Sequence, residues 1–232
     1  MAMPVPEVSA AEGELLLIDK PKGWTSFDVV KKIRHLTHGR RTGHAGTLDP
    51  MATGLLIICT GKKTREIQQF VGLDKEYEAE MELGASTASY DAETPIERRR
   101  SLEGISEEQV RQVMREFVGL QRQLPPMWSA AKVKGRRLYQ YARKGIEVPR
   151  QHREVMITAI VPTMIAIPRV GFNVTCSKGT YIRSLVNDIG ERLGCGAFLA
   201  SLRRTRIGPY LLRDAMTIER LVDTWQCNGG AA

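Results

Sequence analysis

The feature that most constrains the fold is a strictly alternating stretch, EYEAEMELG, at residues 76–84. Its four glutamates fall on one face of an extended chain, whereas Tyr77 falls on the opposite face together with an alanine, a methionine and a leucine. Because successive side chains of a strand point to opposite faces, this period of two predicts a β-strand. The strand should have one face in water and one face in the core.

Other periodic stretches predict further strands and helices. Apolar runs predict four more strands, at residues 14–21, 54–61, 155–167 and 170–179, and Pro162 interrupts the third of them. Helical spacing and capping residues predict four helices, at residues 25–39, 106–119, 180–194 and from Thr217 onward. The first helix should carry Phe27, Val30 and Ile33 inward. Because regular βαβ alternation is missing, the pattern predicts an α+β fold with a mixed, largely antiparallel central sheet flanked by helices and loops.

Composition gives no sign of a second domain, a disulfide scaffold or a membrane segment. The four cysteines are scattered and the four histidines lack the spacing of metal ligands, which argues against disulfides and a zinc site. Cys59 and Cys176 lie in apolar runs and are expected to be small core residues. No apolar run approaches the roughly 20 residues of a membrane span, and the N-terminus lacks signal-peptide features, so we expect a cytoplasmic protein.

Net charge points to a polyanionic partner. The chain has 34 Lys and Arg against 26 Asp and Glu, which gives +8 at pH 7. Residues 132–154 hold eight of these basic side chains, with Tyr139 and Tyr141 among them. Basic groups interleaved with aromatic rings suit phosphates and unstacked bases. The alternative is a solvated helix face with the two tyrosines packed beneath it.

A single aspartate stands in an unusual setting in RRTGHAGTLDPMATG, residues 40–54. Because Asp49 precedes Pro50, its backbone is biased toward extended conformations, which predicts a loop or a helix N-cap. The stretch DPMATG could then be one helical turn that ends at Gly54.

The neighbours of Asp49 favour a ligand site over a simple cap. Glycines let the backbone approach a ligand closely, and Arg40 and Arg41 can contact phosphates. A carboxylate beside arginines stays ionised, as a nucleophile or a base requires. His44 could bond a phosphate or stack on a base, or it could be a loop histidine satisfied by the backbone.

The same stretch resembles a known family. GHAGTLDPMATGLLIICTGKKT is similar to the catalytic motif of the TruB family of tRNA pseudouridine synthases. The likeness continues through LLLIDKPKGWTSFDVVKKIR, KEYEAEMELG, PPMWSAAKVKGRRLYQYARKGIEVPR and CSKGTYIRSLVNDIGERLGCGAFLASLRRTRIG, and it covers about residues 14 to 222 in one order. It implies the pseudouridine synthase fold and conversion of uridine 55 in the tRNA T loop into pseudouridine.

The resemblance also implies roles for single residues. Asp49 matches the catalytic aspartate, which attacks the target nucleotide so that the uracil detaches, rotates and rejoins through C5. Arg183 matches the arginine that pairs with that aspartate, and Tyr77 matches the tyrosine that stacks on the flipped uracil. Three further positions match residues that line the substrate pocket: His44, Tyr181 and Leu202. Lys20 and Pro21 match a motif that supports the active-site loop.

Each of these roles has a simpler alternative in the residue pattern alone. Tyr77 lies on the dry face of its strand and could be a core tyrosine. Arg183 lies off the apolar stripe of its predicted helix and could be exposed. Leu202 is at helical spacing from Phe198 and Leu199 and could be core. Conversely, a target base inside a folded T loop must be extruded, and an aromatic stack with phosphate contacts would offset that cost.

The resemblance sets the expected organisation and partners. We expect a disordered N-terminus at 1–13, a catalytic domain at 14–222 with an RNA-binding insertion at 121–153, and a tail at 223–232. Many family members continue into a small C-terminal domain resembling PUA, which this chain is expected to lack. The expected partner is the T-arm of tRNA, bound by a monomer without a metal or other cofactor. The expected RNA contacts are Arg40, Arg41, Lys132, Lys134, Arg136, Arg137, Arg143 and Lys144.

Three alternatives remain open at this point. The chain could be a guide-RNA-dependent relative, or a noncatalytic RNA-binding or folding protein that keeps the fold. A carboxylate-dependent hydrolase is the third, and it is disfavoured because no second acid stands in a comparable motif.

Overall fold

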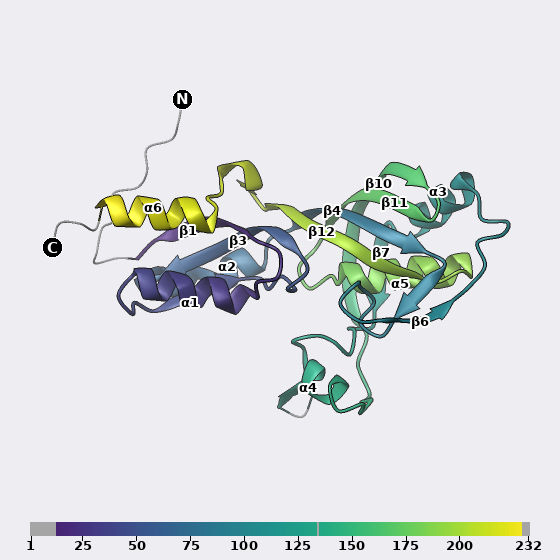
Figure 1. Cartoon of the computed structure of the whole chain (residues 1–232), viewed down its shortest axis with the longest axis horizontal. Helices are drawn as coiled ribbons and strands as arrows, with labels where there is room; N and C mark the ends of the chain where they lie inside the picture. The colour runs from purple at the N-terminus through teal and green to yellow at the C-terminus, as the bar shows by residue number, and fades with distance from the viewer. Residues whose placement is uncertain (1–12, 134, 229–232) are drawn as a thin grey trace. The chain divides into compact units, whose positions relative to one another are not determined.

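The computed structural model describes residues 13–133 and 135–228, and its longer elements are labelled in Figure 1. The chain divides into two compact units. The first unit contains the residues up to Leu73 and those from Arg204 onward, and the second contains Asp74–Arg203. Lys134 and most of the predicted N-terminal segment 1–13 lie outside the described residues, as do the last four residues of the predicted tail.

The first unit is a small antiparallel sheet with helices packed on it. Strand β1 (Leu15–Lys20) pairs with β3 (Thr53–Thr60), which also pairs with β2 (Thr42–Ala45). One core cluster joins β1 and β3 to helices α1 (Ser26–Leu36) and α6 (Ile218–Asn228). The shorter elements of this unit are η1 (Gly61–Glu66), α2 (Ile67–Val71), β13 (Tyr210–Leu211) and η2 (Leu212–Asp214).

The second unit contains a larger sheet in the order β12-β4-β11-β10-β7. The pairings from β4 to β7 are all antiparallel. These strands are β4 (Lys75–Leu83), β7 (Gly119–Gln123), β10 (Arg153–Ala166), β11 (Arg169–Cys176) and β12 (Ala197–Ile207), and the last residues of β12 belong to the first unit. The other elements are β5 (Ala85–Thr87), β6 (Ile96–Arg99), α3 (Glu107–Glu116), β8 (Lys132–Val133), β9 (Arg136–Arg137), α4 (Leu138–Ala142) and α5 (Ile182–Leu193).

The alternating stretch behaves as its sequence predicts. It forms β4, in which Tyr77, Met81 and Leu83 are buried while Glu78 is exposed. The predicted capping box is confirmed at the start of α1, where Thr25 accepts from the backbone of Asp28 and the Asp28 carboxylate accepts in return. The largely antiparallel sheet and the α+β class are likewise confirmed.

Two predicted core cysteines are buried as expected. Cys59 and Cys176 are 0% and 1% exposed. Burial raises the pKa of the Cys59 thiol to about 11, so this thiol stays protonated and unreactive near neutral pH. In the described part of the chain, no helix is long and apolar enough to cross a membrane.

Three local predictions are wrong. Phe27 is 65% exposed, because α1 turns Ser26, Val29, Val30 and Ile33 toward the core and leaves Phe27 outside that stripe. Pro162 does not interrupt its strand, since β10 continues past it with a register shift between Pro162 and Met164 that accommodates the missing N–H. The helical spacing of Leu202 from Phe198 and Leu199 does not correspond to a helix, because all three residues lie in strand β12.

A glycine allows α5 to pack closely against β12. A β-carbon at Gly190 would lie 2.2 Å from the backbone nitrogen of Ala197, which is closer than any real contact. Although alanine favours a helix over glycine by about 1 kcal/mol, the clash requires a backbone shift. Gly190→Ala is therefore expected to lower the free energy of unfolding by about 2 kcal/mol, measured by chemical denaturation. A stabilised variant would contradict this packing.

Candidate active site

Asp49 lies in the loop that joins β2 to β3 in the first unit. The N–H of Ala52 donates to the carbonyl of Asp49 at 3.1 Å, which closes a turn with Pro50 and Met51 at its centre. Proline suits the second position of such a turn because its φ is already fixed. Residues 49–52 thus form a β-turn, Thr53 and Gly54 begin β3, and the helical turn that the sequence suggested is wrong. The Asp49 side chain is half-buried.

Two side chains from the start of the chain hold this turn. The fully buried ammonium of Lys20 donates to the carbonyls of Trp24 at 2.6 Å and Pro50 at 3.4 Å. The hydroxyl of Ser26 accepts from the N–H of Leu48 at 2.8 Å and lies 3.1 Å from its carbonyl. These contacts agree with the supporting role that the resemblance implies for Lys20.

A third side chain, Arg204 of β12, is bonded to both ends of the same loop. Its Nε donates to the carbonyl of Leu55 at 2.7 Å, and its Nη2 donates to the carbonyl of Gly46 at 3.1 Å. The side chain is 1% exposed. Sequence reasoning missed it, because nothing in the local pattern links Arg204 to a loop 149 to 158 positions earlier in the chain.

His44 lies on β2, just before the loop. Burial lowers the pKa of its imidazole, and the positive charge of Arg204 lowers that pKa further, so the neutral form is favoured near neutral pH. Its Nδ1 is buried without a hydrogen-bond partner among the described residues. A neutral imidazole with a free ring nitrogen can bond to a ligand. Arg41 is exposed and Arg40 is half-buried on the same stretch.

In the second unit, Arg183 is buried rather than exposed. The first turn of α5 places its guanidinium 3.3 Å from the carboxylate of Asp91, and both side chains are almost fully buried. Two further bonds join Arg183 to the carbonyls of Ser89 at 3.0 Å and Trp128 at 2.8 Å. The alternative of a solvent-exposed arginine is therefore wrong.

Asp91 is itself held in place. Its carboxylate accepts from the hydroxyl of Ser89 and from the N–H of Glu93 at 2.9 Å. Its main-chain carbonyl accepts from Thr87 at 2.7 Å. Asp91 thus orients the Arg183 guanidinium, a role that sequence reasoning missed, because nothing in the local pattern links the two residues.

The remaining predicted pocket residues of the second unit come from three elements. Tyr181 precedes α5, and the Gln123 side chain bonds to both its N–H, at 2.9 Å, and its carbonyl, at 3.1 Å. Tyr77 on β4 and Leu202 on β12 are each 8% exposed. The first unit therefore holds Asp49 and His44, and the second holds the other four residues. The predicted pairing of Arg183 with Asp49 stays a prediction.

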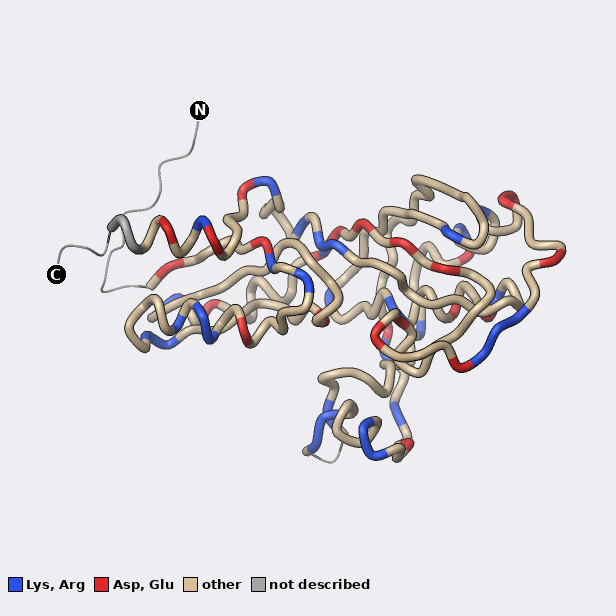
Figure 2. Tube along the Cα trace, in the orientation of Figure 1, with Lys and Arg blue, Asp and Glu red and all other residues tan. Residues whose placement is uncertain are grey.

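The predicted RNA-binding insertion displays its basic side chains to solvent. Figure 2 shows Lys and Arg concentrated around α4. The exposed residues are Lys132, Arg136, Arg137, Arg143 and Lys144. The Arg143 guanidinium lies over the Tyr139 ring, 5.4 Å from its centre. A cavity of about 320 Å³ at the base of the insertion is lined by, among others, Lys132, Leu138, Arg150 and His152.

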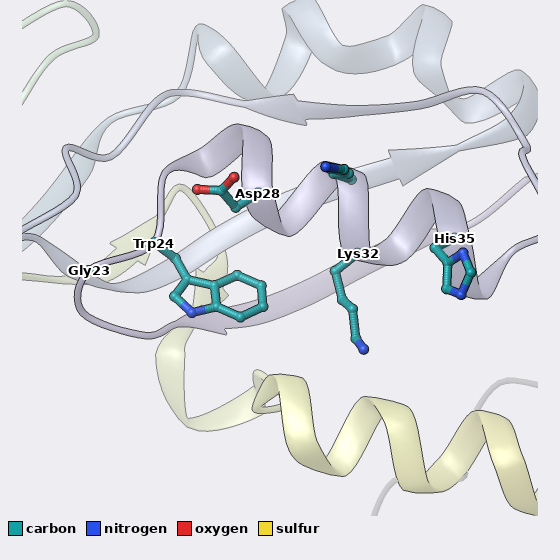
Figure 3. A pocket seen from close by; sticks show the side chains of 6 residues that line it. Gly23, Trp24, Asp28, Lys32 and His35 are labelled. Atoms are coloured by element: carbon teal, nitrogen blue, oxygen red, sulfur yellow. The ribbon is translucent and has the colours of Figure 1, made fainter.

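A second hollow, of about 530 Å³, lies along α1 (Figure 3). Figure 3 shows the Trp24 ring and the Lys32 side chain on the same side of the helix. The lining residues are Gly23, Trp24, Asp28, Lys31, Lys32 and His35. None of the residues predicted for the site lines this hollow. Among the described residues, no group of three or more His, Cys, Asp or Glu side chains is arranged to hold a metal ion.

Two family models match adjacent parts of the chain. Residues 34–182 match the model of the TruB family pseudouridylate synthase N-terminal domain, and residues 183–230 match that of the tRNA pseudouridylate synthase B C-terminal domain. A tRNA pseudouridine synthase B of Chloroherpeton thalassium is 47% identical over 91% of this chain and 90% of its own length. One of Flavobacterium johnsoniae is 44% identical over 93% of this chain and 97% of its own length.

Solved structures share the fold. The chain superposes on a protein of a Cbf5-Nop10-Gar1 complex with a TM-score of 0.73 and 33% identity. A second similar structure is an H/ACA RNP bound to a substrate RNA containing 2′-deoxyuridine, with a TM-score of 0.69 and 31% identity. The matches cover 95% and 93% of this chain but only 57% and 55% of those chains.

The buried pair of Asp91 and Arg183 should matter for stability. Asp91→Ala leaves a buried guanidinium with carbonyl partners but without this carboxylate, and we expect the free energy of unfolding to fall by about 3 kcal/mol. The matched control is Glu116→Ala, which removes an exposed pair with Arg192 at 2.9 Å and should cost less than about 1 kcal/mol. Equal losses in urea denaturation of the two variants would show that Asp91 is not the principal partner of Arg183.

Proposed function

This chain belongs to the TruB family of pseudouridylate synthases, and we propose that it isomerises a uridine of tRNA to pseudouridine with Asp49 as the nucleophile. The observation that carries the function is similarity over about nine-tenths of the chain to enzymes named tRNA pseudouridine synthase B. We further propose uridine 55 of the T loop as the target. The predicted monomeric state and cytoplasmic location remain part of this proposal.

The reaction replaces the bond from C1′ of the ribose to N1 of uracil by a bond from C1′ to C5. The Asp49 carboxylate attacks the target nucleotide, the bond from C1′ to N1 breaks, and the uracil rotates. A bond from C1′ to C5 then forms, the bond between the Asp49 carboxylate and the nucleotide breaks, C5 loses its proton, and N1 ends with one. No electrons are gained or lost overall. The protein's part is to hold an ionised carboxylate and to control where the detached uracil moves.

The turn around Asp49 supports the nucleophilic role. Lys20 and Ser26 bond to the backbone on either side of Asp49, so its carboxylate projects from a fixed main chain. An arginine beside the carboxylate would keep it ionised. We propose Arg183 for this role, because Asp91 and two carbonyls already fix the direction of its guanidinium.

When the target base leaves the RNA, protein side chains must replace the stacking interactions that the base loses. Unstacking a base costs a few kcal/mol, and an aromatic ring returns about 1–3 kcal/mol. Tyr77 is rigidly held on β4 and is proposed to stack on the uracil and to help remove the C5 proton. The neutral imidazole of His44 is proposed to assist extrusion, while Tyr181 and Leu202 complete the pocket. The exposed basic side chains of the insertion supply phosphate contacts.

The similarity to H/ACA proteins favours one alternative, a synthase that needs a guide RNA. The relatives named tRNA pseudouridine synthase B outweigh it, because they are 44–47% identical and match nearly their full length. The H/ACA structures are matched over little more than half of their chains. Activity on a bare T-arm stem-loop would separate the two possibilities, and binding without turnover would revive the noncatalytic alternative.

The nucleophile can be tested with a T-arm transcript that carries tritium at C5 of uracil. The wild-type protein should release tritium, and Asp49→Asn should lower the rate by more than about a thousandfold, because an amide cannot act as the nucleophile. Asp214→Asn removes an exposed carboxylate of the same unit and should leave the rate unchanged. No release by the wild type, or undiminished release by Asp49→Asn, would reject the proposal.

The phosphate contacts can be tested through salt. Replacing Arg136 and Arg137 together by Gln should weaken tRNA binding and reduce the slope of log Kd against log salt by about 1.5 to 2, because each lost contact releases about one counterion fewer. The control replaces Arg111 and Arg115 by Gln; these exposed arginines pair with glutamates of their own helix. A slope that falls equally in both double variants would show that the insertion has no special part in binding.

A further inference from the structure

Arg204 is a buried cation whose charge is not balanced by a neighbouring carboxylate among the described residues. The side chain is 1% exposed, and its bonds go to two neutral main-chain carbonyls. None of the described carboxylates forms an ion pair with it. Taking a guanidinium out of water without a counter-ion is costly, and an apolar side chain would normally stabilise a strand at least as well. The residue therefore needs a reason other than stability.

The two carbonyls belong to the two ends of the Asp49 loop. Gly46 follows β2, and Leu55 lies at the start of β3. One planar guanidinium thus joins the strand that enters the loop to the strand that leaves it. An arginine can do this because its donors point in different directions in one plane, whereas a lysine offers one ammonium at one point.

The backbone of Arg204 lies against the same loop. Gly54 has φ of +99°, and a β-carbon there would lie 2.3 Å from the carbonyl oxygen of Arg204. Only glycine permits this approach together with this φ. The main chain and the side chain of Arg204 therefore fix the loop from one direction, while Lys20 and Ser26 fix it at Pro50 and Leu48.

We propose that Arg204 is a positioning residue, which fixes the ends of the loop so that the Asp49 carboxylate keeps its reactive position. The role rests on the proposed function of Asp49. Since Arg204 acts through the loop backbone, its loss should lower the rate of the chemical step without weakening tRNA binding. Its charge also acts on His44, whose lowered pKa is partly due to this guanidinium.

The test compares Arg204→Lys with the wild type in three measurements. Single-turnover tritium release should fall between about 10-fold and 100-fold, as a small misplacement of a reacting group predicts. The KM and Kd for tRNA should change less than about twofold, because no RNA contact is removed. Hydrogen exchange measured by mass spectrometry should accelerate in the peptide that covers residues 46–55 and stay unchanged elsewhere.

Arg206→Lys is the matched control, because this arginine lies two residues further along and donates to the carbonyl of Gly208 at 2.9 Å. It should leave rate and loop exchange at wild-type values. Arg204→Lys with a wild-type rate and unchanged loop exchange would overturn the proposal. The exchange result stands even if the wild type releases no tritium, so failure of the proposed function is distinguishable.

A variant that does not fold would also lose activity, so folding of each variant is checked separately. Arg204→Gln keeps an amide donor without the charge, and it replaces the lysine variant if that variant does not fold. Thermal unfolding of each variant is measured first. If neither variant folds, Arg204 serves overall stability rather than the position of Asp49, and the proposal is wrong.

Discussion

A fully buried ammonium needs an acceptor for each of its protons, and Lys20 obtains them from the main chain. Its carbonyl acceptors lie in Pro21, Trp24 and Pro50, which places the end of β1, the approach to α1 and the Asp49 turn around one charge. The geometry of the turn depends on this interaction, because one buried charge bonds to all three segments. Arg204 of β12 likewise donates to main-chain carbonyls, those of Leu55 and Gly46.

Patterns of period two and local capping were sufficient for much of the fold. The alternation around Tyr77 predicted β4 and its buried face, and the αL glycine at Gly194 ends α5 as expected. Predictions failed where one pattern fits two structures. The apolar residues near Leu202 fit a helix or a strand, and Asp-Pro begins either a helix or a turn. Tertiary contacts decide between such alternatives, and no local window contains them.

The candidate site residues and the supporting Lys20 were predicted through family resemblance, whereas the roles of Asp91 and Arg204 were not. Arg183 pairs with Asp91 across 92 positions of sequence, and Arg204 bonds to Leu55 and Gly46 across 149 and 158. A buried arginine in a strand or at a helix start is a weak signal by itself, because arginine is usually exposed. The acceptors around each guanidinium are therefore known only from the structure. The domain boundaries predicted at 14 and 222 remain a prediction.

The contact of Arg143 with Tyr139 bears on the RNA binding proposed for the insertion. Before RNA binds, the guanidinium covers a ring face that a nucleobase could use, and such a contact is worth about 0.5–1 kcal/mol at an exposed site. If the insertion binds RNA as proposed, a base that stacks on this ring would displace the arginine, which would then be free to contact a phosphate. The contact between Arg143 and Tyr139 would then be replaced by two contacts with RNA, one from the ring to a base and one from the guanidinium to a phosphate. A polyanion without an unstacked base has no group to stack on the Tyr139 ring, so Arg143 would stay on that ring.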